Sequence, residues 1–310
     1  MWISILIVFL ALLCISLVQV LIFAINNQGK INVFTSDVRN EETKQKEETI
    51  DLSQIKDLEL KFSGSELKVI WTDEPNLKIV QYATRKLESN EYFRKEQTNS
   101  KCTISEGKIN WRFLFFNFNR ICYDVYIPRS YQQNLSITTV SSNIQAEADI
   151  TLQEFQLKAT SGDIKIPGTI TAQKLTIDAV SGNVILGKVD AKEVKIKTIS
   201  GDVKVEEVQN VEAKTTSGKI EMGTVKQKAD LESISGKITI NHFAMTEDSS
   251  CKTTSGNIKI GVGQDINCQI RTKTVSGKVQ LPDDRNVLGN EPYTNLRLES
   301  ISGNLRVEQE

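Results

Sequence analysis

Histidine is almost absent from the chain, which has a single one, His242, among 310 residues. One histidine excludes metal sites built on histidine pairs and leaves one candidate base for a Ser-His or Cys-His catalytic arrangement. No nucleophile motif lies beside His242, which precedes Phe243, so we interpret it as a surface residue in a turn. The sequence therefore offers little for histidine-based catalysis.

A charge excess is also lacking, because 38 Lys and Arg residues balance 39 Asp and Glu residues and leave a net charge of −1. Such a chain is a poor match for a phosphate backbone, so nucleic-acid binding is not expected. The sequence also lacks a Gly-rich phosphate loop and the dense GGxGxD repeat that binds calcium. We predict no cofactor, no metal and no nucleic acid.

Long apolar runs are absent except at the start, where residues 3–25 contain no charged side chain. At a rise of about 1.5 Å per residue, this segment spans roughly 35 Å and can cross a hydrocarbon core of about 30 Å. The rival interpretation is a cleaved signal peptide, but no basic residue precedes the run, which also exceeds the usual apolar core of about 7–15 residues. We predict a transmembrane signal anchor at 1–25, with residues 3–25 in the membrane.

The charges around this segment leave its orientation open. Lys30, Arg39, Lys44 and Lys46 follow it and no basic residue precedes it, which by the positive-inside rule places the rest of the chain in the cytoplasm. Long domains, however, translocate largely regardless of charge. Residues 26–50 are polar and charged, as is typical of a linker.

Short alternating apolar runs begin after this linker, at 58–62 and again at 67–71. A period of two bounded by turn residues indicates strands, so we predict a β-rich N-terminal part and cap at 51–134. Its Phe-rich stretch at 111–119 is either an exposed patch for a membrane or partner, or a plug over the apolar end of the following domain. We favour the plug.

From residue 135 onward one phrase recurs nine times, as in KATSGDIKI, KTISGDVKV and ESISGNLRV. Self-similarity at a period near 20 residues is typical of a solenoid, in which each copy covers the apolar face of the next. A propeller blade would need about 40–50 residues. The first serines of the phrases are Ser141, Ser161, Ser181, Ser200, Ser217, Ser235, Ser255, Ser276 and Ser302.

Apolar residues change sides at the Ser-Gly pair. Counted from the serine, they occupy positions −6, −4 and −2 before it and +3 and +5 after it, and one more lies midway to the next copy. Because alternate residues of a strand point to opposite faces, the switch from even to odd requires a bend, where glycine reaches backbone angles closed to other residues. The predicted structural turn residues are Gly162, Gly182, Gly201, Gly218, Gly236, Gly256, Gly277 and Gly303.

These patterns predict an all-β fold: a single-stranded parallel β-helix, or β-solenoid, of about nine coils at 135–310, preceded by the transmembrane helix and the β-rich cap. Nine equivalent serines at a corner indicate structure rather than catalysis. Position +2 is Asn, Asp or Lys in every copy, which we interpret as a solvated ridge rather than the acidic cluster of a polysaccharide-degrading β-helix. We predict no catalytic residues and no enzyme.

The cysteines outside the anchor are Cys102, Cys122, Cys251 and Cys268. The last two fall at offsets −4 and −8 of successive coils, a displacement of about 13 Å along a strand, which is too far for a disulfide. The pairing of Cys102 with Cys122 stays open.

With the serial SGD, SGN and SGK phrases and the Ile127-Pro128 turn, residues 55–310 resemble the bacterial putative-adhesin family of β-strand-repeat proteins, a domain of unknown function expected to form β-solenoids. Members are commonly membrane-anchored or secreted, so the resemblance implies a single-pass membrane protein with the bulk of the chain outside the cytoplasm. It supplies no catalytic or ligand-binding residues. The chain departs from it in the stretch at 111–119 and in the long gap between Ser276 and Ser302.

These features favour an interaction protein, a membrane-anchored, adhesin-like solenoid of the bacterial cell envelope that displays its repetitive surface to a protein or glycan partner. The alternative is a structural scaffold whose coil ends stack on one another. The charged end Glu308-Gln309-Glu310 counts against it, because charge at a terminal strand edge discourages strand addition. A carbohydrate-active β-helix enzyme is the remote alternative.

Overall fold

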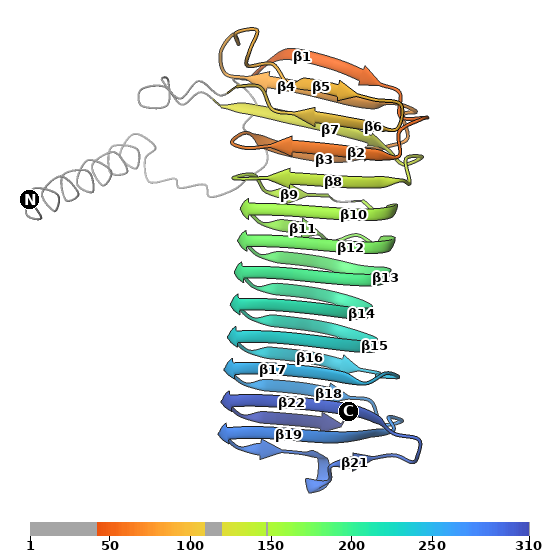
Figure 1. Ribbon diagram of the computed structural model, residues 1–310, viewed down its shortest axis with the longest axis vertical. Helices are drawn as coiled ribbons and strands as arrows, with labels where there is room; N and C mark the ends of the chain where they lie inside the picture. The colour runs from red at the N-terminus through yellow and green to blue at the C-terminus, as the bar shows by residue number, and fades with distance from the viewer. Residues whose placement is uncertain (1–41, 109–119, 147, 310) are drawn as a thin grey trace, which may run out of the picture. The chain divides into compact units, whose positions relative to one another are not determined.

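The computed structural model describes residues 42–108, 120–146 and 148–309, all within one compact unit. Over these ranges the regular structure is β-strand with one 3₁₀ turn, so the predicted all-β class is confirmed. The strands lie across a rod and stack along its length (Figure 1). Their bounds are β1 Thr43–Ile50, β2 Asp57–Phe62, β3 Glu66–Thr72, β4 Leu77–Ala83, β5 Arg94–Gln97, β6 Lys101–Ser105, β7 Ile121–Pro128, β8 Asn134–Thr139, β9 Ile144–Gln145, β10 Ile150–Ser161, β11 Ile164–Ile166, β12 Ile170–Ser181, β13 Val184–Ser200, β14 Val203–Ser217, β15 Ile220–Ser235, β16 Ile238–Phe243, β17 Ser249–Ser255, β18 Ile258–Val262, β19 Cys268–Ser276, β20 Val279–Gln280, η2 Pro282–Asp284, β21 Val287–Leu288, β22 Thr294–Ser302 and β23 Leu305–Gln309.

The localisation predicted from the sequence, a single-pass membrane protein, is wrong. In the ranges that the structure describes, no helix has the length and apolar character needed to cross a bilayer. The described chain is instead built from strands whose outward side chains are largely polar or charged. The predicted anchor at 3–25 lies outside the described residues, as does the predicted plug at 111–119.

Parallel pairing along the rod follows the repeat. Strand β10 pairs with β12, β12 with β13, β13 with β14 and β14 with β15, and their corner serines are register partners from Ser161 to Ser235. Strands that follow the corner pair separately, as β11 does with β13. The stacked parallel strands confirm the predicted solenoid.

The side chains predicted to face inward form one continuous core. The parity of the buried positions changes at the Ser-Gly corner and twice more before the next one, so the coil has three short sides. The register shifts where β13 meets β14, in the connecting stretch that shortens to give the 17-residue spacing between Ser200 and Ser217. The buried residues of one coil are Val184, Leu186, Val189, Ala191, Val194, Ile196 and Thr198.

The last repeat does not end the rod. Strand β22 pairs in parallel with β17 on one side and with β19 on the other. Its continuation β23 pairs with β18 and with β20. The coil of residues 294–309 therefore lies between two coils that precede it in the sequence.

The long gap before Ser302 makes this insertion feasible. After β20 the chain turns outward at η2 and crosses the end of the rod in β21, which pairs antiparallel with β19. Val287, expected on the third side of a coil, lies in β21 instead, and Val279 is 42% exposed because no coil covers it. The first two residues of β23, Leu305 and Arg306, are paired on both sides, whereas Glu308 pairs with β18 alone and keeps one open edge.

At the opposite end the stacked sheet continues into the N-terminal part. Strand β2 pairs in parallel with β8 and with β6, which adds two strands beyond the first repeat. A separate four-stranded sheet has the order β1-β4-β7-β3, with β3 and β7 parallel and the other neighbours antiparallel.

Candidate functional site

The eight predicted glycines form one column along the corner, where each packs against the backbone of a neighbouring coil. A Cβ built on Gly218 would lie 2.1 Å from the carbonyl oxygen of Gly201, and one on Gly303 would lie 1.9 Å from that of Gly256. Of the eight, only Gly182 has a positive φ angle, 158°. Glycine is required here because a side chain does not fit between the stacked backbones, rather than for a left-handed conformation.

Two hydrogen-bonded columns flank the glycines. At −2, five of the seven Ser and Thr hydroxyls donate to the glycine carbonyl of a neighbouring coil, as Thr253 does to Gly236 at 3.2 Å. At +2, the side-chain oxygen of Asn183 accepts the backbone N–H of Asp202 at 3.0 Å, and Asp202 in turn accepts that of Lys219 at 2.8 Å. The +2 column is thus partly a ladder and not only a solvated ridge. The repeated serine belongs to a structural corner.

Sequence reasoning identified the −2 and +2 positions but missed the hydrogen bonds that both columns form, although the residue types carried the signal. Asn or Asp fills six of the nine +2 positions, and Thr or Ser fills seven of the nine −2 positions. Both types hold a hydrogen-bonding oxygen close to the backbone, which suits contacts to main-chain groups. A preference for them at a fixed offset predicts side chain-to-backbone bonds between coils.

His242 lies in β16 rather than in a turn, and its register partner is Thr224 in β15.

The four described cysteines are free and buried, so Cys102 and Cys122 do not form a disulfide. Burial raises the pKa of the Cys268 thiol to about 11 and raises that of Cys251 further, which removes thiolate character at neutral pH. Among the described residues, no group of His, Cys, Asp and Glu could hold a metal ion.

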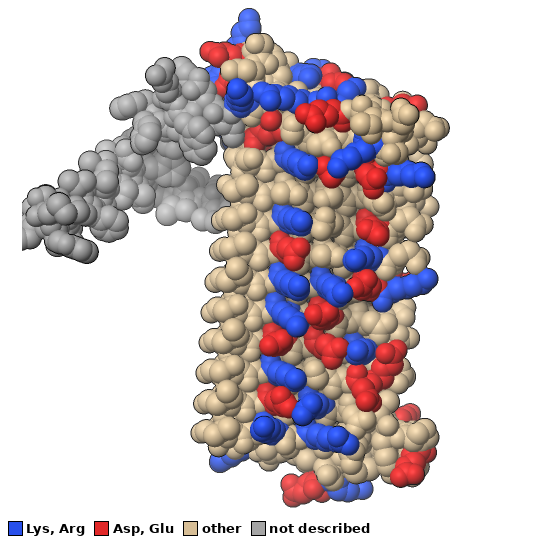
Figure 2. Space-filling view, in the orientation of Figure 1, with Lys and Arg blue, Asp and Glu red and all other residues tan. Residues whose placement is uncertain are grey.

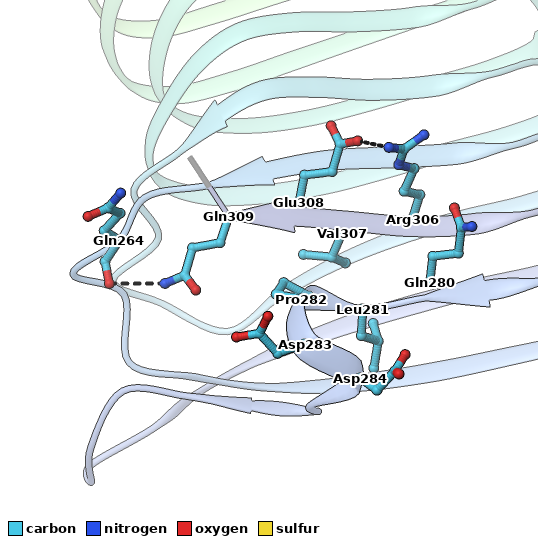
Figure 3. A pocket seen from close by; sticks show the side chains of 10 residues that line it. All are labelled: Gln264, Gln280, Leu281, Pro282, Asp283, Asp284, Arg306, Val307, Glu308 and Gln309. Atoms are coloured by element: carbon cyan, nitrogen blue, oxygen red, sulfur yellow. Dashed lines mark hydrogen bonds and ion pairs between the residues drawn. The ribbon is translucent and has the colours of Figure 1, made fainter.

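A polar hollow of about 770 Å³ opens at the terminal coil (Figure 3). It exists because β20 has only two residues and the chain then turns away at Pro282, which has no N–H to continue the ladder. The end of β23 is left uncovered and forms one wall. The lining residues are Gln264, Gln280, Leu281, Pro282, Asp283, Asp284, Arg306, Val307, Glu308 and Gln309.

The charges of this hollow are largely paired. Glu308 forms ion pairs with Arg306 and Lys259, and Asp283 pairs with Arg285. Gln309 Nε2 donates to the backbone oxygen of Gln264 at 3.1 Å. The hollow offers amide and carboxylate oxygens to a polar ligand but no nucleophile activated by a base.

Lysine and acidic side chains cover one broad face of the rod in mixed rows (Figure 2). We call the outward positions −3 and −5 of strands β13, β14, β15, β17 and β22 the charged face. Its ion pairs run within and between coils: Lys214 contacts Glu212 at 3.5 Å and Glu232 at 3.3 Å, and Lys252 contacts Glu299 at 3.8 Å. The side chains of the charged face are Lys195, Lys197, Glu212, Lys214, Asp230, Glu232, Ser250, Lys252, Arg297 and Glu299.

The stacked coils, the corner column and the charged face together define the architecture. A family model described as Toastrack DUF4097 matches residues 55–308. The chain belongs to the Toastrack DUF4097 family. This confirms the resemblance inferred from the Ser-Gly phrases, and the Toastrack match includes β2 and β6, whose strands extend the repeat sheet.

Several solved structures are similar to this Toastrack chain at low identity. A putative adhesin from Bacteroides fragilis is 14% identical, with a TM-score of 0.46 over 85% of this chain and 96% of that one. A putative adhesin from Parabacteroides distasonis is also 14% identical, with a TM-score of 0.44 over 84% and 96%. A putative lipid binding protein from the same species is 15% identical, with a TM-score of 0.41 over 86% and 97%. None of the curated proteins matches the chain.

Proposed function

We propose that this Toastrack protein is a non-catalytic, adhesin-like binding protein that holds a charged linear polymer, glycan or polypeptide, on its charged face. The supporting observation is the regularity of that face. Parallel strands at a spacing of about 4.8 Å repeat the same outward positions from coil to coil. A partner with its own regular charges can therefore contact several coils at once.

Multiple weak contacts favour this mode of binding. Exposed ion pairs are individually worth about 0–1 kcal/mol, so the lysines of the charged face can exchange their acidic neighbours for groups on a partner at little cost. Repeated contacts along a chain then add through effective concentration. Lys197 and Lys214 are register partners and both carry positive charge, which makes their coils the strongest point for an acidic partner.

The absence of an active-site arrangement among the described residues supports the non-catalytic assignment. The corner serines lie beside the packed glycine column and belong to the structural corner. His242 lies on β16, away from the corner, and the described thiols are buried. A scaffold built by end-to-end stacking is the weaker alternative, because Arg271 and Lys273 lie exposed on β19 at the end of the rod and would oppose strand addition.

An array of immobilised polysaccharides and homopolypeptides, including acidic, basic and neutral members, tests the proposal with the full-length chain. We expect binding to acidic members that weakens as salt rises. The double variant Lys197→Glu/Lys214→Glu is expected to lose it. The matched control Lys165→Glu/Lys204→Glu places the same charge change after the corner and should keep it. Equal binding by both double variants, or binding to no array member, would contradict the proposal.

A further inference from the structure

An uncharged ridge runs along the Ser-Gly corner. Position −1 is Val, Ile or Thr in all nine copies, position 0 is Ser, and position +1 is Gly or Ser. In Figure 2 this edge of the rod, at the left of the view, is uncharged along most of its length. We call the −1 side chains the corner ridge: in stacking order they are Val140, Thr160, Val180, Ile199, Thr216, Ile234, Thr254, Ile301 and Val275.

The ridge concentrates the exposed apolar surface of the described chain. Ile199 is 53% exposed, Ile234 51%, Ile301 56% and Val275 77%. With Val140 and Val180 the ridge holds six of the eight large hydrophobic side chains that the described residues leave exposed. Scattered exposed apolar residues are ordinary, but a single aligned row of them marks an interaction surface.

The area of the ridge argues for a partner that also contacts its flanks. Nine levels at about 4.8 Å give a strip of roughly 40 Å. A stable interface buries about 800 Å² per partner, so a strip of this length must be about 20 Å wide. That width includes the outward rows on either side, at −3 and +2. An occupant must therefore match both the apolar ridge and the charges of these two rows.

A second copy of the chain in antiparallel orientation meets this condition. If the two-fold axis passes at Thr216, the middle of the nine coils, every coil of one chain lies opposite a coil of the other. The −3 row of one chain then faces the −3 row of the second chain, which runs in the opposite direction. Three distinct pairs are then of opposite charge. They are Lys158 with Glu299, Asp178 with Lys252, and Lys197 with Glu232.

The +2 rows are compatible with the same arrangement. Asp202 faces Lys237 of the second copy, and most other pairs contain Asn. Like charges meet only on the axis, at Lys214 and at Lys219, where long side chains can turn toward solvent.

In a parallel dimer each −3 row meets the +2 row of the second copy at the same level. Three distinct pairs are then of opposite charge (Lys158–Asp163, Lys197–Asp202 and Glu232–Lys237) and two of like charge (Lys214–Lys219 and Lys273–Lys278), and each occurs twice. The antiparallel dimer has more opposite-charge pairs and fewer like-charge pairs, so it is favoured.

We propose that the corner ridge is a homodimer interface, in which two copies of the chain pack ridge to ridge and antiparallel, with Thr216 on the two-fold axis. This inference does not rest on the proposed polymer binding and competes with it for the −3 row, because only the −5 row of the charged face stays open in such a dimer. It also differs from end-to-end stacking, because the rods lie side by side and the contact closes after two copies.

Cysteine cross-linking of the full-length chain tests the geometry. In a Cys14→Ser background, Thr216→Cys should be joined to its copy by a short bis-maleimide, because the two sites face each other. Paired sites react at an effective concentration on the order of mM, so at µM protein the rate should exceed that of free collision by at least about a hundredfold. Thr160→Cys should not cross-link with itself, since its copies lie six levels, about 29 Å, apart.

Mixing two singly substituted chains supplies the positive counterpart. Thr160→Cys and Ile301→Cys face each other in the antiparallel dimer, so the mixture should give a heterodimer that neither variant gives alone. The double variant Ile199→Lys/Ile234→Lys should abolish the Thr216→Cys product while its melting temperature stays that of the parent, because both side chains are exposed. Equal cross-linking of Thr160→Cys and Thr216→Cys, or none by either, would overturn the proposal.

Discussion

The backbone amide of Asn304 donates to the side-chain oxygen of Asn257 at 2.8 Å, although a complete repeat with its own strands β19 and β20 separates the two coils in the sequence. The same placement recurs at the next level, where the amide of Lys278 donates to Asn304 at 2.8 Å. The last repeat therefore donates a +2 hydrogen bond to the coil on one side and accepts one from the coil on the other. Its position fixes the row order of the charged face, the terminal hollow and the corner ridge.

Gly218→Val is expected to destabilise the protein far more than Lys219→Ala. The valine Cβ would start 2.1 Å from the carbonyl oxygen of Gly201, and relieving such overpacking costs about 1–3 kcal/mol and disturbs both neighbouring coils. The Lys219 side chain is exposed and its backbone amide is unaffected by truncation, so its change should stay within about 0.5 kcal/mol. Thermal melts decide the matter, and equal melting temperatures would show that the glycine column is not the constraint.

Lys237→Asn is expected to stabilise the protein. Lys219 and Lys237 interrupt the ladder of +2 acceptors, and an asparagine at 237 could accept the backbone N–H of Asn257 as Asn257 accepts that of Asn304. A new hydrogen bond of this type is worth about 0.5–1.5 kcal/mol. Urea denaturation of the parent, Lys237→Asn and the control Lys237→Ala measures the gain. A Lys237→Ala variant as stable as Lys237→Asn would refute the ladder as the cause.

Much of this architecture is readable from the sequence, because burial acts on every copy in the same way. Inward positions such as Ile196 and Val205 follow from the parity of the apolar residues, and the bend follows from its reversal. The stacking order of the last two coils cannot be predicted from the sequence, because equivalent repeats can pair with one another in any order. Only the long gap before Ser302 hinted at it, and neither its crossing strand β21 nor the short β20 has a strong local pattern. The corner ridge was also missed, because uncharged −1 residues carry no familiar motif.

Glu59 should make stability depend on acid pH. Hydrogen bonds from Lys101 and Lys61 lower the pKa of Glu59 to about 2, against an ordinary value of 4.5. The unfolded chain therefore takes up the proton first as the pH falls, so the stabilisation is complete above pH 4.5 and is lost toward pH 2. Urea denaturation at pH 6, 4 and 3 should show a smaller loss for Glu59→Gln than for the parent. Parallel pH profiles would exclude Glu59 as a contributor.

Cys251 should be unreactive until its coil opens. Its thiol is buried in the core, and desolvation raises its pKa above the usual range, so the native protein holds almost no accessible thiolate. Labelling with an aromatic disulfide reagent should be slow for Cys251 and fast for a cysteine placed at the exposed Lys165, and denaturant should equalise the two rates. Fast native labelling of Cys251, located by peptide mapping, would contradict the continuous core.

Intrachain disulfide formation between −3 positions tests the inserted coil most directly. Lys252 and Glu299 are register partners on adjacent strands β17 and β22, whereas Lys252 and Lys273 are separated by β22. Neighbouring strands lie about 4.8 Å apart, within disulfide reach, and second neighbours lie about 9.6 Å apart, beyond it. Oxidation of Lys252→Cys/Glu299→Cys should therefore give an intrachain disulfide by peptide mapping, and Lys252→Cys/Lys273→Cys should give none. The reverse result would mean that the coils stack in sequence order.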